Sequence, residues 1–439
     1  MVAALWLLAP TSMYADGGKR EFRGAWMQFV NGMYLGKSTA EIQQMLTHQL
    51  DELEKDGANA IIFQVRGECD ALYESKIEPW SRYLTGVQGK APSPYWDPMA
   101  WMIQQCHRRG MEFHAWINPY RARMKSPTRL ADNHILKTHP ERAFEYGGLY
   151  VLNPGLKENR DYILSVVDDI VGRYDIDGIH IDDYFYPYPE GGRPIPDDRE
   201  YALYNNGIAD RGDWRRYNVN LFVKEMGEHV HKLKPWVKFG VSPFGIYRNK
   251  KSSPIGSDTN GLQNYDQLYA DVLLWVNNGW IDYCVPQLYW HIGHPLADYE
   301  KLIKWWAKHM ANRPLYIGES IENTVQNSDP ANPNTHQMAA KFRLHRQLRN
   351  VSGTVLWYAK VAAEDMGSYG TMLRNVYWKS KALPPYMPFM DNKAPKKPAK
   401  MGDAWTEDGL MLYWSAPKAK KWGDEARPMS FTASPRARK

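Results

Sequence analysis

The chain has 439 residues and a formal net charge of +6, and its basic residues are dispersed apart from a basic stretch between residues 393 and 421. A mild, dispersed charge argues against a nucleic-acid-binding surface, which concentrates basic residues in one patch. The three cysteines lie far apart and are odd in number, which excludes a disulfide framework and a cysteine metal site, and the length allows one large domain with a small appendage.

Residues 1–18 resemble a secretory signal, because they are apolar up to Pro10 and then small and polar around Ala15. The positive segment with which such signals begin is missing. The apolar run is too short to cross a bilayer as a helix, and no other run in the sequence is long enough. We therefore expect no transmembrane helix and a location outside the cytoplasm, in the periplasm, at the cell surface or in the medium.

Eight predicted strands alternate with eight predicted helices along most of the chain. The strands are expected at residues 23–30, 59–66, 111–123, 176–181, 237–245, 281–290, 314–323 and 353–360. The helices are expected at residues 39–55, 97–109, 158–174, 214–233, 267–277, 296–310, 336–349 and 366–378. The strand at 59–66 is almost continuously apolar, as in parallel sheets that are buried on both faces.

This alternation indicates an α/β fold with a parallel sheet, and eight units favour a (β/α)8 or TIM barrel, here at residues 19–383. A doubly wound open sheet is the alternative. That fold usually carries a glycine-rich phosphate-binding loop after its first strand. The glycines and lysine at residues 29–39 miss the spacing of such a loop.

The end of the chain has a different composition. Residues 384–400 are rich in proline and lysine and are predicted to be a linker. Within residues 401–439, the alternating run at 409–417 resembles the opening strand of a fibronectin type III domain. Such a sandwich needs roughly 90–100 residues, so we expect only an incomplete β-sandwich segment here.

The stretch DIDGIHIDDYFYPYP at residues 175–189 organises the predicted site. Its apolar alternation reads as a buried strand, and the strand ends in Asp182 and Asp183. Active sites of TIM barrels lie at the C-terminal ends of the strands. Ile179 and Ile181 suit the side that faces the helices, so we expect His180 and Asp182 to point into the barrel.

Other acidic residues follow other predicted strands. Glu68 and Asp70 come after the second strand, and Glu319 comes at the seventh. Glycoside hydrolysis needs two carboxyl groups, one protonated and one ionised. We interpret Asp182 as the nucleophile or cation stabiliser, with Asp183 beside it, and leave the proton donor open among Asp70, Glu68 and Glu319.

Polar and aromatic side chains surround these acids in the predicted barrel. Arg66 is a candidate for binding a carboxylate or a sugar acid through two hydrogen bonds. The candidates for binding sugar hydroxyls are Asn118, His180 and Gln287. Aromatic rings stack on sugar faces, and the candidates are Tyr120, Tyr184, Tyr289, Trp290 and Trp357. The histidines lack a metal-ligand spacing of the HExxH kind, so we expect no metal and no other cofactor.

Several long motifs resemble one known family. They include FQVRGECDALYESKIEPWSRYLTG, MEFHAWINPYRA, YDIDGIHIDDYFYP and GWIDYCVPQLYW. In order along residues 21–378, they are similar to the glycosyl-hydrolase-like family ten, a branch of the TIM-barrel glycosidases. The chain departs from that pattern at Gly67 and Glu68, because a proline often follows the arginine equivalent to Arg66. GIHID is also similar to the fourth-strand motif of α-amylase-type barrels, whose nucleophile takes the place of Asp182.

The resemblance implies a glycoside hydrolase that acts on a polysaccharide outside the cytoplasm, since members are usually secreted or lipid-anchored bacterial proteins. One enterobacterial relative is similar to a hydrolase of peptide-free peptidoglycan strands, which makes such strands one expected substrate. The amylase-type acid on the fifth strand is absent, because residues 241–245 carry no carboxylate. The alternative is a catalytically silent barrel that binds carbohydrate. A polysaccharide deacetylase would need a metal cluster that the sequence does not show.

Overall fold

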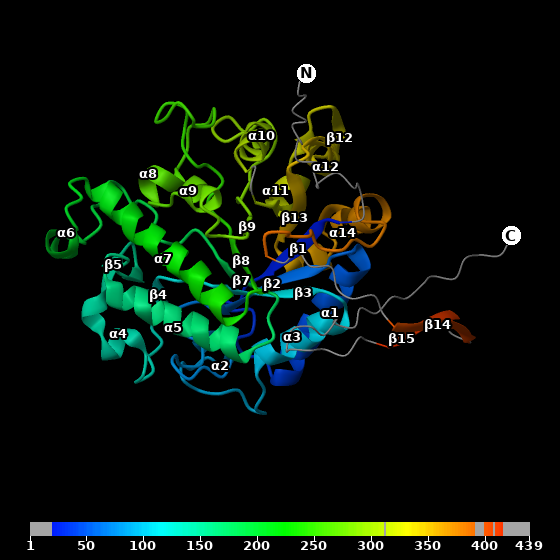
Figure 1. The fold of residues 1–439 in the computed structure, drawn as a ribbon, viewed down its shortest axis with the longest axis horizontal. Coiled ribbons are helices and arrows are strands. Elements are labelled where there is room, and N and C mark those ends of the chain that lie inside the picture. The colour runs from blue at the N-terminus through cyan, green and yellow to red at the C-terminus, as the bar shows by residue number, and fades with distance from the viewer. Residues whose placement is uncertain (1–19, 311–312, 391–398, 407–408, 416–439) are drawn as a thin grey trace, which may run out of the picture.

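A computed structural model describes residues 20–310, 313–390, 399–406 and 409–415. Eight of the described strands form a closed barrel in which every neighbouring pair is parallel. They are β1 (Phe22–Met27), β2 (Ala60–Arg66), β3 (Glu112–Ile117), β7 (Gly178–Ile181), β8 (Lys238–Val241), β9 (Tyr283–Cys284), β10 (Leu315–Ser320) and β13 (Val351–Trp357). They follow one another around the barrel in chain order, which confirms the predicted (β/α)8 fold (Figure 1).

Helices surround the barrel (Figure 1). The longer ones are α1 (Thr39–Asp56), α3 (Pro98–Arg108), α5 (Lys157–Arg173), α7 (Arg211–Leu233), α10 (Tyr299–His309) and α12 (Met338–Gln347). The shorter ones are α2 (Arg82–Thr85), α4 (Ile135–Thr138), α6 (Asp198–Tyr204), α8 (Asn264–Gln267), α9 (Val272–Asn277), α11 (Ile321–Val325), α13 (Ala359–Ala363) and α14 (Tyr369–Met372). Helix α1 shows how local sequence sets the bounds: Ser38 and Glu41 form a capping box at its start, and Gly57 ends it in a left-handed conformation.

Two predicted helices are broken in the structure. The helix expected at residues 366–378 is instead η2 (Met366–Ser368), α14 and η3 (Leu373–Tyr377), because Gly367 and Ser368 have positive φ angles that interrupt a helix. The helix expected at 267–277 is divided into α8 and α9, with Tyr269 at positive φ between them.

Small antiparallel sheets complete the fold. Strands β4 (Arg121–Met124), β5 (Ala143–Tyr146) and β6 (Leu149–Leu152) lie in the long connection after β3, and β11 (Ser328–Asp329) pairs with β12 (Asn332–His336). At the end of the chain, β14 (Ala399–Thr406) pairs with β15 (Gly409–Ser415). The signal-like segment 1–18 and most of the predicted linker and sandwich segment lie outside the described residues. Before that gap, Met387 packs against the barrel interior.

Two apolar layers follow from the alternation of the strands. Ile179 and Ile181 pack in the layer between strands and helices, whereas His180 faces the barrel interior, as the sequence predicts. The interior contains Phe22 stacked on Tyr316, with centroids 4.2 Å apart, and the ring of Tyr283. Tyr283 Oη lies 2.7 Å from Nδ1 of His114 and 3.1 Å from Nδ1 of His180.

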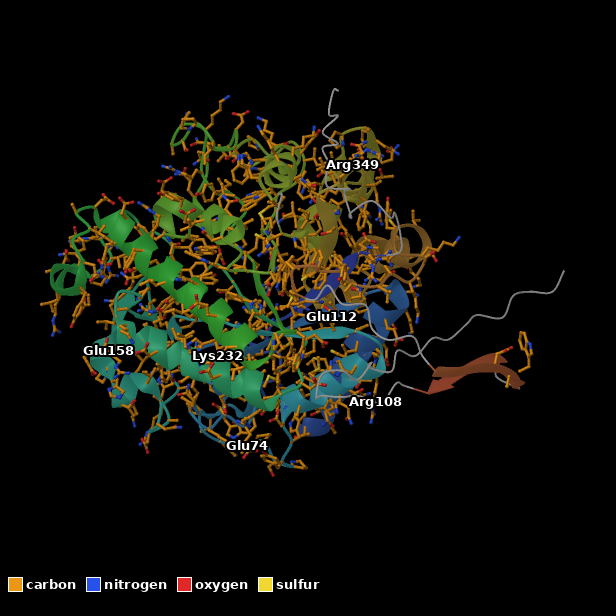
Figure 2. The ribbon with its side chains drawn as sticks, viewed as in Figure 1. Glu74, Arg108, Glu112, Glu158, Lys232 and Arg349 are labelled. Atoms are coloured by element: carbon orange, nitrogen blue, oxygen red, sulfur yellow. The ribbon has the colours of Figure 1, made fainter. Side chains whose placement is uncertain are left out.

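Polar groups extend from these rings toward both ends of the barrel. His180 Nε2 lies 2.9 Å from Ser242 Oγ, and His114 Nε2 lies 3.1 Å from a carboxylate oxygen of Glu112. Glu112 in turn pairs with Lys238 at 2.5 Å, and Figure 2 shows it at the start of β3 near the middle of the molecule. The interior is therefore a packed core crossed by hydrogen bonds.

Glycines make room for the interior rings. A Cβ atom on Gly240 would lie 1.9 Å from the ring of Tyr283, and one on Gly178 would lie 2.3 Å from His114. We expect Gly240→Ala to destabilise the fold by about 1–3 kcal/mol or more, because the rigid ring is enclosed on all sides. Gly172→Ala on α5 is the control: nothing lies within 4 Å of the added Cβ, so about 0.5–1 kcal/mol of stabilisation is expected. Urea denaturation measures both, and equal stability of Gly240→Ala and the parent would contradict the close contact.

Candidate active site

Asp182 lies at the C-terminal end of β7 and accepts hydrogen bonds from the neighbouring strand β3. The indole Nε1 of Trp116 donates to its Oδ2 at 3.1 Å, and Nδ2 of Asn118 donates to the same oxygen. Among the residues that the structure describes, the other oxygen, Oδ1, meets one donor, the backbone N–H of Tyr184, at 3.4 Å. Asp182 is 5 % exposed, so this carboxyl group is held at the barrel mouth with one oxygen firmly bound.

Asp183 is held by different partners. The phenol of Tyr188 donates to its Oδ2, and Nε2 of Gln287 donates to its Oδ1 at 3.1 Å. The chain bends at Asp183, so this side chain reaches the segment after β9. Both oxygens of Asp183 therefore receive a side-chain donor, whereas only one oxygen of Asp182 does.

The two carboxyl groups share an unfavourable environment for charge. Burial raises the pKa of Asp182 to about 7, the negative charge of Asp183 adds to the rise, and Arg121 opposes it. Burial also raises the pKa of Asp183, and the hydrogen bonds from Tyr188 and Gln287 oppose that rise. Two adjacent buried carboxylates repel each other, so the pair retains a proton near neutral pH. We place it on Asp182, because Asp183 is the better hydrogen-bonded anion.

An aromatic surface stands beside this pair. Tyr289 and Trp357 stack with ring centroids 5.9 Å apart and an interplanar angle of 26°. Trp26 meets the edge of Trp357 at 6.1 Å, and Trp116, which binds Asp182, meets it at 6.3 Å. Tyr289 and Trp357 are only half-buried. They therefore form a platform on which a sugar ring can stack, next to a carboxyl group.

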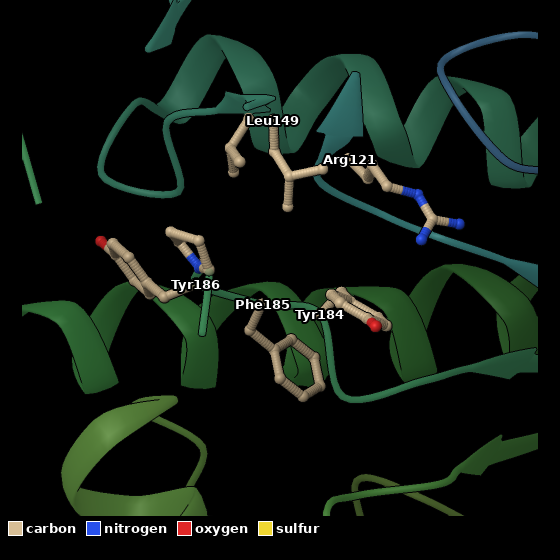
Figure 3. Close-up of a pocket in the computed structure, with 7 residues that line it drawn as sticks. Arg121, Leu149, Tyr184, Phe185 and Tyr186 are labelled. Carbon is tan, nitrogen blue, oxygen red and sulfur yellow. The ribbon is translucent and has the colours of Figure 1, made fainter. Parts of the chain in front are cut away.

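A small pocket opens next to the segment that follows the two acids. Figure 3 shows the segment of Tyr184, Phe185 and Tyr186 across from Arg121 of β4 and Leu149 of β6, with the ring of Phe185 turned away from them. The guanidinium of Arg121 lies 5.2 Å from the ring centroid of Tyr184. The predicted site residue Tyr184 thus lines a pocket beside the carboxyl pair.

Arg66, which we predicted as a substrate contact, uses its hydrogen-bond donors on other groups of the protein. Its guanidinium binds Glu78 through Nε and Nη2 at 2.8 and 2.7 Å, and its Nη1 donates to the backbone carbonyl of Asn118 at 2.5 Å. The side chain is completely buried. Arg66 therefore holds the turn after β3 and has no surface for a substrate, contrary to our expectation.

The two acids after β2 also have local partners. Glu68 receives Arg82 Nε at 2.9 Å and the backbone N–H of Met124 at 2.8 Å. Asp70 receives Gln88 Nε2 at 3.2 Å, and burial and the charge of Glu68 raise its pKa to about 6. These bonds tie the loop after β2 together, so we now give Glu68 and Asp70 a structural role.

Glu319 faces away from the barrel mouth, which corrects its prediction as an acid. Tyr316 faces the barrel interior, so Glu319 lies on the side of Leu315 and Ile317, which faces the helices. There it pairs with Lys341 of α12 at 2.5 Å, and both side chains are 1 % exposed.

Three further side chains that we predicted as sugar contacts pack against other side chains of the protein. Tyr120 is fully buried and packs edge-on against Phe222 of α7. Trp290 packs against Phe244. His180 lies one layer below Asp182, is fully buried, and its pKa is lowered by burial. Full burial of Tyr120 and His180 does not agree with the expected sugar contact. Trp290 is half-buried, so its sugar contact stays a prediction.

Sequence reasoning missed several side chains at the mouth. Trp116 and Asn118 bind Asp182 together, but only Asn118 was a candidate. Gln64 donates to Asn118, and Tyr188 donates to Asp183. Gln28 directly follows β1, two residues after Trp26, and its buried amide oxygen has no hydrogen-bond partner among the described residues. Alternation in β1 and β3 is the signal that would have found Trp116 and Gln28.

The sequence of residues 21–334 matches the family described as Glycosyl hydrolase-like 10. The chain belongs to this family. Glycosyl hydrolase YngK of Bacillus subtilis is 41 % identical over 390 residues, which cover 86 % of this chain and 76 % of the relative. Glycosyl hydrolase DigH of Escherichia coli O6:H1 is 37 % identical over 332 residues, 72 % of this chain and 75 % of the relative. Both names agree with the predicted class of enzyme.

A solved structure agrees on the fold. The glycoside hydrolase domain of PgaB (BpsB) from Bordetella bronchiseptica superposes with a TM-score of 0.50 and 11 % identity, over 81 % of this chain and 98 % of that domain. The predicted glycosyl-hydrolase-like family and the barrel fold are therefore confirmed. Within the described residues, no helix is long and apolar enough to span a membrane, and no group of three or more His, Cys, Asp or Glu side chains could hold a metal ion.

The buried pair of Glu319 and Lys341 gives a test of the corrected geometry. Lys341→Met leaves the carboxylate buried without its cation, so we expect a loss of about 3–5 kcal/mol in unfolding free energy. The double variant Glu319→Leu/Lys341→Met removes both charges and should recover most of that loss. Urea denaturation of the parent and both variants measures the effect. A loss in the single variant below about 1 kcal/mol would contradict the buried pairing.

Proposed function

We propose that this family member hydrolyses O-glycosidic bonds of a polysaccharide outside the cytoplasm, with Asp182 and Asp183 as its carboxyl pair. The observation that supports it is the proton-retaining pair beside the stacked rings of Tyr289 and Trp357. Glycosidases need an acid and an anion at one bond, together with a surface that binds the flat face of a sugar. This site has both.

Asp182 suits the role of proton donor, which revises our interpretation of it as the nucleophile or cation stabiliser. A pKa of about 7 keeps it protonated at the pH where a general acid is most effective. Its proton passes to the oxygen of the leaving sugar as the C–O bond breaks. A water molecule then adds to the sugar cation and loses a proton, which restores the acid form of Asp182. Asp183, held as an anion by Tyr188 and Gln287, stabilises the positive charge that develops on the other sugar.

The sugar would lie on the platform of Tyr289 and Trp357. Gln28 adds a polar contact, since its unpartnered amide oxygen can accept a hydrogen bond from a sugar hydroxyl or amide N–H. Peptide-free glycan strands of peptidoglycan are the first substrate to examine, on the family resemblance described above. The signal-like segment supports action outside the cytoplasm.

The test is incubation of the full chain with a panel of purified glycans, including peptide-free peptidoglycan strands, followed by mass spectrometry of the products. Shortened products with one added water per cleavage support the proposal. Binding to a glycan by calorimetry, with no product from any member of the panel, would favour the silent carbohydrate-binding barrel instead.

We expect Asp182→Asn to lower turnover by about 10²–10⁴-fold or more, because the amide cannot donate the acid proton. Its melting temperature should stay close to that of the parent. Asp70→Asn is the matched control, and turnover within a few-fold of the parent is expected. Asp183→Asn removes the anion that stabilises the developing positive charge, so it should also lower turnover. Turnover within a few-fold in Asp182→Asn would refute the assignment and leave Asp183 or the acids after β2 as the centre.

The pH dependence follows from the same pair. Activity should fall as the pH rises through about 7, because Asp182 then loses the proton that it donates. In Asp183→Asn the neighbouring negative charge is gone, so the pKa of Asp182 falls and the alkaline limb moves to lower pH. The measurement is kcat/KM from about pH 4 to about pH 9 for both proteins, a range that brackets the expected limb. An alkaline limb in Asp183→Asn that stays in place would contradict the coupling.

A further inference from the structure

Gln64 has a fixed orientation, although it was not a predicted site residue. It lies on the interior side of β2 and is completely buried. The backbone N–H groups of Phe29 and Val30 lie 3.0 and 3.4 Å from its Oε1. Backbone N–H groups only donate, so the carbonyl end of Gln64 must face them. Its Nε2 therefore faces Asn118, to whose Oδ1 it donates at 2.6 Å.

Asn118 is fixed from two sides. Its Oδ1 receives Gln64 Nε2 and also Nη2 of Arg121, at 2.5 Å. A guanidinium has no acceptor, so the amide end of Asn118 must point away from Arg121, toward Asp182. The constraint from Phe29 and Val30 and the constraint from Arg121 are independent, and both give the same orientation.

The result is an asymmetric Asp182. Its Oδ2 receives hydrogen bonds from two N–H donors, those of Asn118 and Trp116. In this orientation, neither group can accept a hydrogen bond from a proton on Oδ2. A carboxylic acid proton on Oδ2 would point at one of these donors. Within the described part of the chain, Oδ1 meets a single weak donor, the N–H of Tyr184 at 3.4 Å, so this oxygen is the better place for the proton.

We propose that Gln64 is a positioning residue that, through Asn118, keeps the dissociable proton of Asp182 on Oδ1. The proposal deepens the proposed function, since it names the oxygen from which the acid proton leaves. The proton assignment itself concerns the protein without substrate. It is therefore testable whether or not a substrate is found.

The test is a titration of the Asp182 carboxyl carbon by NMR in protein labelled with ¹³C at the aspartate Cγ, with Asp182→Asn used to assign the signal. Gln64→Met keeps the length of the side chain and adds no charge, but removes the donor to Asn118. N–H donation to a carboxylate lowers its pKa, so we expect the midpoint of Asp182 to rise by up to about one pH unit. An unchanged midpoint in the folded variant would overturn the proposal.

A double-mutant cycle tests the path through Asn118. Gln64→Glu should raise the midpoint further, because the ionised carboxylate that replaces the amide cannot donate to Asn118 and repels its Oδ1. In an Asn118→Leu background, Gln64→Glu should shift the midpoint of Asp182 only through its own charge. The shifts caused by the two single substitutions should therefore not be additive in the double variant. Additive shifts would overturn the path. If Asn118→Leu fails to fold, Gln64→Met decides the question alone.

The outcome is separate from that of the proposed function. If the glycan panel gives no product but the NMR midpoint of Asp182 shifts in Gln64→Met, the proton assignment stands and only hydrolysis is refuted. Products from the parent with an unchanged midpoint in Gln64→Met refute only the assignment. Thermal melting of each variant checks that the fold is retained.

Discussion

The hydrogen bonds that Asp182 accepts from Trp116 and Asn118 join two neighbouring strands at the barrel mouth. Trp116 also meets Trp357, so the carboxyl group and the aromatic platform are held to one another. Asn118 in turn is held by Arg66 through its backbone carbonyl and by Arg121 through its side chain. Both buried arginines therefore help to position one acid.

The fold could be predicted because its signals are local and repeated. Apolar runs, caps and stop residues recur along the chain, and a parallel barrel is the architecture that accommodates them. The side of β7 that faces the barrel interior could also be predicted, since Ile179 and Ile181 alternate with the polar His180. The orientation of β10 could be predicted by the same rule, because Leu315 and Ile317 share a side with Glu319, whereas Tyr316, Gly318 and Ser320 lie on the other. Glu319 was named as a candidate acid for its place at the end of a strand, without use of that alternation.

Partners that return from distant segments could not be predicted. Glu78 lies twelve residues after Arg66 in an irregular loop, and no sequence periodicity indicates that its carboxylate pairs with the guanidinium of Arg66. The same holds for Arg82 with Glu68 and for Lys341 with Glu319. A charged residue at a strand end marks the region of the site. Whether that charge is already neutralised depends on tertiary contacts that a single sequence does not contain.

The hydroxyl of Tyr283, in the middle of the barrel, has one proton and meets Nδ1 of two imidazoles. It can donate to only one ring and must accept from the other. Burial favours the neutral form of Glu112, but Lys238 and His114 outweigh it and lower the pKa to about 2, so Glu112 is an anion that accepts from Nε2 of His114. For rings that each carry one N–H, this pattern of hydrogen bonds requires opposite tautomers in His114 and His180. The hydrogen bonds run in one direction along the barrel axis, from Ser242 through His180, Tyr283 and His114 to Glu112, and give the apolar core a polarity of its own.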